Sequence, residues 1–126
     1  MILGIGTDLF EVDRMRKAIE KQTSFVDGVF TIHEINYCNQ FKNSTERFAA
    51  RYAAKEALLK ALGTGWRNGI TFLDIDITND KLGKPSITLT GKAKQIADKL
   101  KVTNIHVSMS HTKTLANAFV IINNHN

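Results

Sequence analysis

The chain has 126 residues, of which 43% are hydrophobic and 23% are charged, a composition that excludes a disordered chain and is typical of one globular domain, residues 1–126. The net charge of +5 favours an acidic partner, such as an acidic protein, a polyphosphate or nucleic acid. The single cysteine, Cys38, cannot form an internal disulfide, which favours a reducing, cytoplasmic location.

The first half of the chain predicts one strand followed by three helices. Residues 2–7 form the expected strand, whose apolar run is too short to span a membrane and lacks the basic flank of a secretory signal. Thr31 and Glu34 form a capping box at the start of the second helix. The glycine turn at residues 63–65 stops the third and longest helix. The expected helices cover residues 11–22, 31–41 and 47–62.

The second half predicts two strand hairpins separated by one helix. Residues 70–78 alternate in polarity and end in an Asn-Asp turn signal, and residues 86–90 form the partner strand. Residues 81–85, with the sequence KLGKP, lie in the loop between them. A helix capped by Thr90 runs to about residue 101. The last hairpin pairs residues 105–110 with residues 115–122, and the order β-ααα-ββ-α-ββ favours a single α+β domain.

The long helix lacks an ordinary polar face. At about 100° per residue, Tyr52 and several leucines form a bulky arc, while alanines fill most of the opposite side. Arg51 and Lys55 fall among the bulky residues, and Glu56 and Lys60 flank the alanines. A solvated surface helix would gather its charges on one side. The distribution therefore indicates a polar site built into a core or an interface.

Asp8 and Glu56 are the candidate metal ligands. A carboxylate just past a buried strand and another inside a packed helix are both costly unless they are paired or bind a metal. Two oxygen ligands without nearby His or Cys suit Mg²⁺, which keeps waters and bridges phosphates. The structural alternative is that Asp8 caps the next helix and that Glu56 pairs with Lys60 at i,i+4.

Arg51, Lys55 and Lys60, with the glycine turn after them, form a candidate phosphate-binding set. Arginine offers a bidentate fork for phosphate, and lysine offers a mobile point charge. The alternative is an ordinary glycine C-cap with lysines that extend to solvent.

The segment VSMSH, residues 107–111, places Ser110 and His111 at the end of a strand, where a ligand can be met. On that strand Ser108 and Ser110 point one way and Val107 and Met109 the other. No nearby aspartate completes a triad, so nucleophilic serine catalysis is not expected. A structural or loop role for His111 is the alternative.

Four short motifs in order carry a family resemblance. They are GIGTD, with Arg14 six residues after Asp8, then RYAAKEALLKALGTG, then GKP, then VSMSH. Across nearly the whole chain they resemble the holo-acyl-carrier-protein synthase group of 4′-phosphopantetheinyl transferases. Tyr52 stands where the wider family has tryptophan in its WAAKEA motif, and another aromatic ring preserves the packing role. The resemblance implies Mg²⁺-dependent transfer of 4′-phosphopantetheine from coenzyme A to a serine of apo acyl carrier protein, which releases adenosine 3′,5′-bisphosphate and supports fatty acid biosynthesis.

The resemblance also implies roles for individual residues. Asp8 and Glu56 would hold Mg²⁺, and Lys60 would stabilise or protonate the leaving phosphate, so these three residues are the expected catalytic set. The general base is either Glu56 or a metal-bound water, and the attacking serine belongs to the carrier. Residues expected to bind coenzyme A are Arg51, Lys60, Gly63, Gly65, Gly83, Pro85, Ser110 and His111. Residues expected to dock the acidic carrier are Arg14, Lys17 and Lys21.

The assembly implied by the resemblance is a homotrimer with coenzyme A bound between neighbouring subunits. Asp8, Glu56 and Lys60 would come from one subunit, and the GKP loop and His111 from the next.

Two other functions compete with this reading. A basic nucleic-acid-binding module would explain the charge, but the lysines and arginines are spread along the chain, and Trp66 with two tyrosines is a thin stacking set. The sequence therefore predicts no nucleic-acid partner and no membrane partner. A Mg²⁺-dependent nucleotide hydrolase would use the same two carboxylates.

Overall fold

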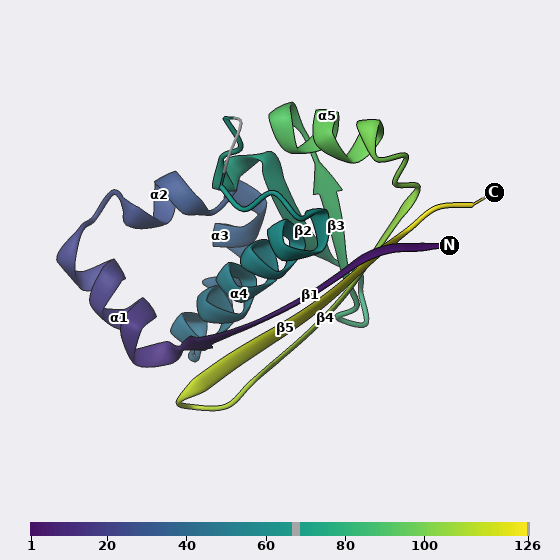
Figure 1. The fold of residues 1–126 in the computed structure, drawn as a ribbon. Coiled ribbons are helices and arrows are strands. Elements are labelled where there is room, and N and C mark those ends of the chain that lie inside the picture. The colour runs from purple at the N-terminus through teal and green to yellow at the C-terminus, as the bar shows by residue number, and fades with distance from the viewer. Residues whose placement is uncertain (67–68, 126) are drawn as a thin grey trace.

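A computed structural model describes residues 1–66 and 69–125. Its long helix α4 lies across one face of a three-stranded antiparallel sheet with the strand order β1-β5-β4 (Figure 1). Strands β2 and β3 form a separate antiparallel hairpin, and β3 contacts the edge strand β4. The helices are α1 (Val12–Lys21), α2 (Phe25–Val29), α3 (Ile32–Cys38), α4 (Ser44–Leu62) and α5 (Gly91–Lys99). The strands are β1 (Ile2–Glu11), β2 (Ile75–Asn79), β3 (Pro85–Leu89), β4 (Asn104–His111) and β5 (Leu115–Asn123).

The α+β fold class is confirmed, with differences at one strand end, in one short helix and in one turn. Strand β1 continues past Asp8 to Glu11, because its pairing with β5 extends to Leu115. The short helix α2 was missed, since five residues show no helical periodicity. Residues Phe72–Asp74 form a 3₁₀ turn where the sequence predicted strand, because Thr71 and Asp74 make a capping box around it.

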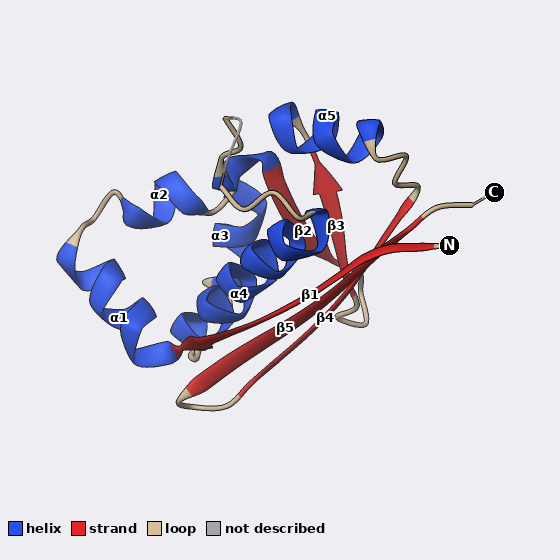
Figure 2. Ribbon diagram, in the orientation of Figure 1, coloured by secondary structure: helices blue, strands red, loops and turns tan. Residues whose placement is uncertain are grey.

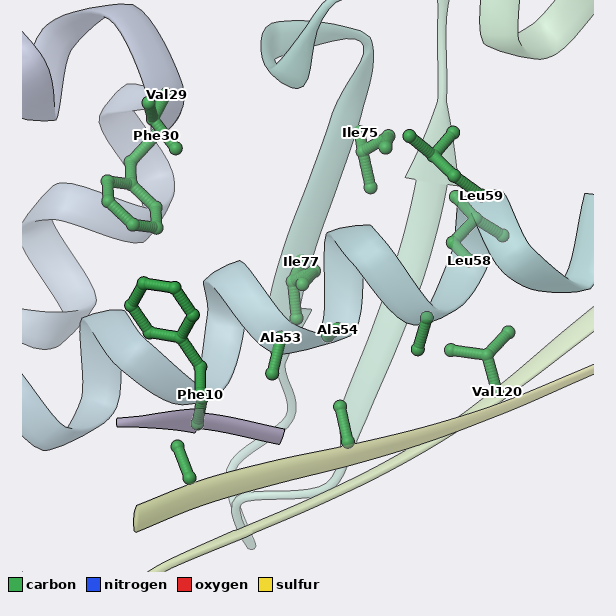
Figure 3. Close-up of a cluster of buried hydrophobic side chains, with 14 of the residues drawn as sticks. Phe10, Val29, Phe30, Ala53, Ala54, Leu58, Leu59, Ile75, Ile77 and Val120 are labelled. Carbon is green, nitrogen blue, oxygen red and sulfur yellow. The ribbon is translucent and has the colours of Figure 1, made fainter. Parts of the chain in front are cut away.

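Helix α4 is buried on nearly every side, which explains why its sequence lacks a polar face. Figure 3 shows its alanines and leucines in one buried cluster with residues from the sheet and from β2, among them Ala53, Leu58, Val120 and Ile77. Within that core, Arg51 is only 3% exposed and Lys55 is fully buried. The prediction that α4 holds charges inside a core is therefore confirmed.

Two glycines of β1 let the sheet approach α4 closely. A Cβ atom at Gly4 would collide with the carbonyl oxygen of Ala61, and one at Gly6 would collide with that of Ala57. No other residue type fits between these backbones. The close approach brings Lys60, next to Ala61, against the segment of β1 that follows Gly6.

The outer face of the three-stranded sheet is uncovered. In Figure 2 the helices lie on one side of this sheet, and no helix of residues 1–66 and 69–125 covers the other. Apolar side chains point out from the uncovered face: Ile5 is 57% exposed, Leu9 63%, Leu115 41% and Phe119 41%. Exposed apolar side chains gathered on one sheet face are typical of an interaction surface.

Within the described part of the chain, none of the helices has the length and apolar character needed to cross a lipid bilayer.

Candidate active site

Asp8 and Lys60 form an ion pair that joins β1 to α4. Lys60 Nζ lies 3.0 Å from Asp8 Oδ1 and also donates to the carbonyl oxygen of Thr7 at 2.9 Å. Asp8 is only 17% exposed at its side chain, and Glu11 rather than Asp8 occupies the N-cap of α1. The alternative in which Asp8 caps that helix is therefore wrong. The Asp8 carboxylate therefore has a cationic partner, Lys60, close to the point where Gly6 lets β1 approach α4.

Glu56 lies one turn before Lys60 on the same flank of α4, but it does not pair with that lysine. Its Oε1 atom accepts a hydrogen bond of 3.0 Å from the indole Nε1 of Trp66. Burial, followed by the negative charge of Glu56, raises the pKa of Tyr52, and the charge of Asp8 adds to this effect. The two carboxylates therefore both act on Tyr52, which lies on the same flank. The structure brings the three expected catalytic residues to one side of α4.

The donor set at this site fits a magnesium ion. Among the described residues no group of three or more His, Cys, Asp or Glu side chains gathers to hold a metal. Asp8 and Glu56 thus supply two carboxylates at most, and Mg²⁺ characteristically takes one or two carboxylates and fills its remaining positions with water and substrate phosphates. Lys60 Nζ pairs with the Asp8 carboxylate through Oδ1.

A second group of the expected residues lines a separate small pocket on the other flank of α4. The pocket has a volume of about 120 Å³ and combines the end of β4, the β2–β3 loop and the first half of α4. Arg51 Nη2 donates to Asn79 Oδ1, and Asn79 Nδ2 donates to the carbonyl oxygen of Gly83 at 2.8 Å. These bonds hold the loop with the sequence KLGKP against α4. The lining residues are Tyr37, Arg47, Ala50, Arg51, Asn79, Gly83, Pro85, Met109 and His111.

The electrostatics of this pocket favour an anion. Arg51 is 3% exposed, its guanidinium lies over the Tyr37 ring at 4.5 Å, and its buried Nε has no hydrogen-bond partner among the described residues. Arg47 lines the same pocket one turn earlier. A buried arginine with a free donor is costly unless an acceptor arrives, and phosphate is the acceptor that matches a guanidinium best. Sequence reasoning missed Arg47, although its i,i+4 spacing from Arg51 was the available signal.

The side chains of His111 and Ser110, at the end of β4, face opposite sides of the sheet. His111 points inward, where its Nδ1 lies 3.0 Å from Glu46 Oε1 and its ring lines the pocket beside Arg51. Ser110 is exposed on the other face of the strand, opposite Asn117 of β5. The predicted alternation along this strand is confirmed. The pocket beside Arg51 therefore includes His111 and does not include Ser110.

Lys55 is not available to a phosphate, so its assignment to the phosphate-binding set is wrong. Its Nζ is fully buried and donates to Glu34 Oε1 at 2.8 Å, to Val29 O at 2.8 Å and to Phe72 O at 3.0 Å. Burial lowers the pKa of Lys55, while the Glu34 carboxylate acts in the opposite direction. The side chain does not extend to solvent either, because its donors are used inside the core.

The glycine turn lies at the Lys60 end of α4, far along the helix from Arg51. Gly63 has a φ of 78° and occupies the C-cap of α4, as the sequence predicted. Gly65 also has a positive φ, of 59°, and both glycines are exposed. The residues expected to bind coenzyme A are therefore divided between the two ends of the helix.

The expected carrier-docking residues Arg14, Lys17 and Lys21 are all exposed on α1. The Arg14 guanidinium lies 4.8 Å from the centre of the Phe10 ring, and Phe10 packs on Tyr52 with 4.5 Å between ring centres. Lys17 pairs with Asp13 at 3.0 Å, so part of its charge is compensated locally. Arg14 is thus the member of this set that is tied to the Asp8 and Glu56 flank.

The two groups of residues lie at opposite edges of the three-stranded sheet. Asp8 is on β1, and its cross-strand neighbour on β5, Ala118, pairs in turn with Met109 on the far edge strand β4. On α4, Arg51 and Lys60 are nine residues apart, which places them on opposite sides of the helix at about 100° per residue. Within one chain the carboxylates and the arginine pocket therefore face away from each other.

A sequence model of the 4′-phosphopantetheinyl transferase superfamily matches residues 4–118. The chain belongs to this superfamily. It is 46% identical over 125 residues to a holo-[acyl-carrier-protein] synthase of Solibacter usitatus, which covers 98% of this chain and 100% of that protein. The agreement with a relative of the same length identifies the branch, and the protein is an enzyme of the holo-[acyl-carrier-protein] synthase group.

Solved structures of this branch share the fold. The holo-[acyl-carrier-protein] synthase of Neisseria meningitidis superposes with a TM-score of 0.87 at 34% identity, covering 98% of this chain and 99% of that one. The enzyme of Bacillus anthracis, solved in complex with coenzyme A (3′,5′-ADP), superposes with a TM-score of 0.82 at 36% identity, covering 99% of each chain. The α+β fold class predicted from the sequence is thus that of solved enzymes of this branch.

Proposed function

We propose that this enzyme transfers 4′-phosphopantetheine from coenzyme A to a serine of an apo acyl carrier protein in a Mg²⁺-dependent reaction, and so supplies holo-carrier for fatty acid biosynthesis. The observation that carries the proposal is the placement of Asp8, Glu56 and Lys60 on one flank of α4, in a chain whose other flank holds a pocket lined by Arg47 and Arg51. The coenzyme A complex of the Bacillus anthracis relative supports the choice of donor.

In this reaction the serine oxygen of the carrier would bond to the phosphorus that bears the pantetheine arm, and the serine hydroxyl proton would pass to the general base, either Glu56 or a water molecule. The bond from that phosphorus to the bridging oxygen of the pyrophosphate breaks, and adenosine 3′,5′-bisphosphate leaves with an additional negative charge. Mg²⁺ held by Asp8 and Glu56 would supply charge neutralisation at the pyrophosphate. The Lys60 ammonium, which already bonds Asp8, would stabilise or protonate the leaving phosphate.

The adenosine 3′,5′-bisphosphate end of coenzyme A carries negative charge that the second pocket would neutralise. Arg51 with its free Nε, and Arg47 beside it, are the donors for a phosphate group. Gly83 and Pro85 on one side and His111 on the other would bound the same ligand. Gly63 and Gly65, at the Lys60 end of α4, would lie near the pyrophosphate rather than near this phosphate.

A shared site in a homotrimer accounts for the separation of the two groups. A ring with three-fold symmetry joins two different surfaces of each subunit, so the β1 edge of one subunit would meet the β4 edge of the next. Asp8, Glu56 and Lys60 of one chain would then face Arg51, the GKP loop and His111 of its neighbour. The uncovered apolar sheet face beside these edges, with Leu9 and Phe119 exposed, supplies surface for such an assembly.

The decisive assay incubates the protein with coenzyme A, Mg²⁺ and an apo acyl carrier protein and measures the intact mass of the carrier. We expect a mass increase of one phosphopantetheine group, which is lost when Mg²⁺ is chelated. Release of adenosine 3′,5′-bisphosphate in the absence of carrier would instead favour a nucleotide hydrolase. An unchanged carrier mass with active, folded protein would refute the proposal.

The shared site has its own test, in which Asp8→Ala and His111→Ala chains are unfolded together and refolded as an equal mixture. An interface that combines intact Asp8 from one chain with intact His111 from the other is wild type at both positions. Random assembly produces that ordered pair at roughly a quarter of interfaces, so about a quarter of wild-type activity should return. If both residues served one site within one chain, mixing would restore nothing. The control is native mass spectrometry, which must detect mixed trimers.

A further inference from the structure

Trp66 is the one tryptophan of the chain, and it contacts a residue of the proposed metal site. Its indole Nε1 donates to Glu56 Oε1 at 3.0 Å. The indole ring also packs on Phe72, with 3.9 Å between ring centres, and Phe72 stacks on Tyr52 with 5.3 Å between ring centres. The indole is therefore held by the Phe72 ring and by the Glu56 carboxylate, although 37% of the residue is exposed.

The hydrogen bond engages one carboxylate oxygen of Glu56, Oε1. Groups that donate to a ligating carboxylate fix its orientation, and their loss characteristically weakens metal binding by 10- to 100-fold. Glutamate has three rotatable side-chain bonds, so an unrestrained Glu56 on the flank of α4 would sample several orientations. The indole removes that freedom for Glu56, while Lys60 restrains Asp8 in the corresponding way.

The aromatic contacts show that the indole is itself positioned. Tyr52 comes from α4, Phe72 from the 3₁₀ turn before β2, and Trp66 from the segment that follows the glycine turn. Phe10 of β1 also packs on Tyr52. The indole packs on the 3₁₀ turn through Phe72, which is itself anchored to α4 through Tyr52, and a donor supported in this way can hold a carboxylate in one orientation.

We infer that Trp66 is a positioning residue for Glu56: its N–H holds Oε1 so that Oε2 is left for the divalent cation. This inference rests on the proposed role of Glu56 as a magnesium ligand. It predicts that loss of the indole N–H alone weakens metal binding about tenfold, the lower end of the range for such groups because the bond is partly exposed. Turnover at saturating metal should change little, since Trp66 touches no reacting atom.

The test compares wild type with Trp66→Phe, which keeps an aromatic ring against Phe72 and removes the N–H donor. Mn²⁺ binding in the presence of coenzyme A is measured from the electron paramagnetic resonance signal of the free ion, which needs no catalysis. The control is Thr103→Val, which removes an exposed hydroxyl that bonds Asn104 Oδ1 and Asn123 O and accepts from His125 N, at the end of the sheet away from Asp8. We expect an approximately tenfold higher dissociation constant for Trp66→Phe and no change for the control.

A second readout observes the hydrogen bond directly. One tryptophan gives one indole N–H signal in a ¹⁵N-correlated NMR spectrum. We expect this signal to shift when Glu56 is replaced by Ala. In wild type it should keep its hydrogen-bonded chemical shift when Mg²⁺ and coenzyme A are added. An indole signal that ignores Glu56→Ala, or a Trp66→Phe protein that binds Mn²⁺ as tightly as wild type, would overturn the inference and leave the proposed function standing. A wild-type protein that binds no Mn²⁺ would overturn the magnesium role of Glu56 and this inference with it.

Discussion

Replacement of Lys55 by methionine tests the ion pair at the centre of the core. Lys55 Nζ makes three hydrogen bonds, to Glu34 Oε1, Val29 O and Phe72 O, and both charged side chains are fully buried. Methionine has a similar length and apolar stem, so the change removes the charge and its donors with little change in volume. Glu34 is then left as a buried carboxylate without its cation.

The expected loss follows from what remains around Glu34. Removal of one partner of a buried pair costs about 3–5 kcal/mol, because the other charge stays uncompensated. Glu34 keeps two backbone donors, since Thr31 N bonds Oε1 at 2.8 Å and Ile77 N bonds Oε2 at 2.9 Å. These bonds favour the lower end of the range. We therefore expect a loss of about 3 kcal/mol in the free energy of unfolding and a fall of roughly 10 °C in Tm.

The matched control is Lys94→Met, which makes the same chemical change in an exposed pair. Lys94 Nζ lies 2.7 Å from Asp98 Oδ1 on α5, with more than half of each side chain exposed. An exposed i,i+4 pair contributes about 0.5 kcal/mol or less. Urea unfolding followed by circular dichroism, at one protein concentration because assembly shifts apparent stability, compares both variants with wild type. Equal urea midpoints for the two variants would refute the structural role assigned to the buried pair.

Three further outcomes follow from the positions of charged and buried groups. Lys60→Ala should lower turnover more than coenzyme A affinity, and Arg51→Ala should do the reverse, which calorimetry and initial rates distinguish. Arg14→Glu should raise the Michaelis constant for the carrier and make it less sensitive to salt, whereas Lys92→Glu on α5, the same charge change, should leave both unchanged. Burial raises the pKa of the Cys38 thiol to about 11, so at pH 8 the folded protein should resist a thiol reagent that labels it after unfolding in urea. Rapid labelling of the folded chain would contradict this expectation.

Local patterns in the sequence predicted most of the helices and strands. Glu34 shows which kind of contact such patterns cannot predict. Glu34 was assigned to a capping box with Thr31, and that box is present. The same Oε1 atom also receives Lys55 Nζ, 21 residues away in the chain. Capping is a short-range relation that spacing reveals, whereas the pairing of Glu34 with Lys55 exists only once α3 packs on α4. The sequence therefore predicted the capping role of Glu34 but not its ion pair with Lys55, and it assigned Lys55 to a phosphate-binding set instead.

In the candidate site too, the residues were predicted from the sequence but most of their contacts were not. Asp8, Glu56 and Lys60 were predicted as one group, but the partners that hold them were not. Trp66 lies ten residues beyond Glu56, past a glycine turn that interrupts any helical spacing, so its hydrogen bond has no periodic signature. The glycines of β1 carry no side chain to suggest a contact, yet they set the distance that lets Lys60 reach Asp8.

The alternation of side chains along β4, in the segment VSMSH, bears on the proposed assembly. Ser110 and His111 are consecutive in a strand, so their side chains face opposite sides of the sheet, and the pocket beside Arg51 includes only His111. His111 lies with Arg51 at the β4 edge, while Ser110 joins the uncovered face that also exposes Phe119 of β5. A site that uses the β4 edge of one chain and the β1 edge of another would border that face in every subunit. The residue pattern of one strand thus links the pocket beside Arg51 to the surface through which we propose that the subunits assemble.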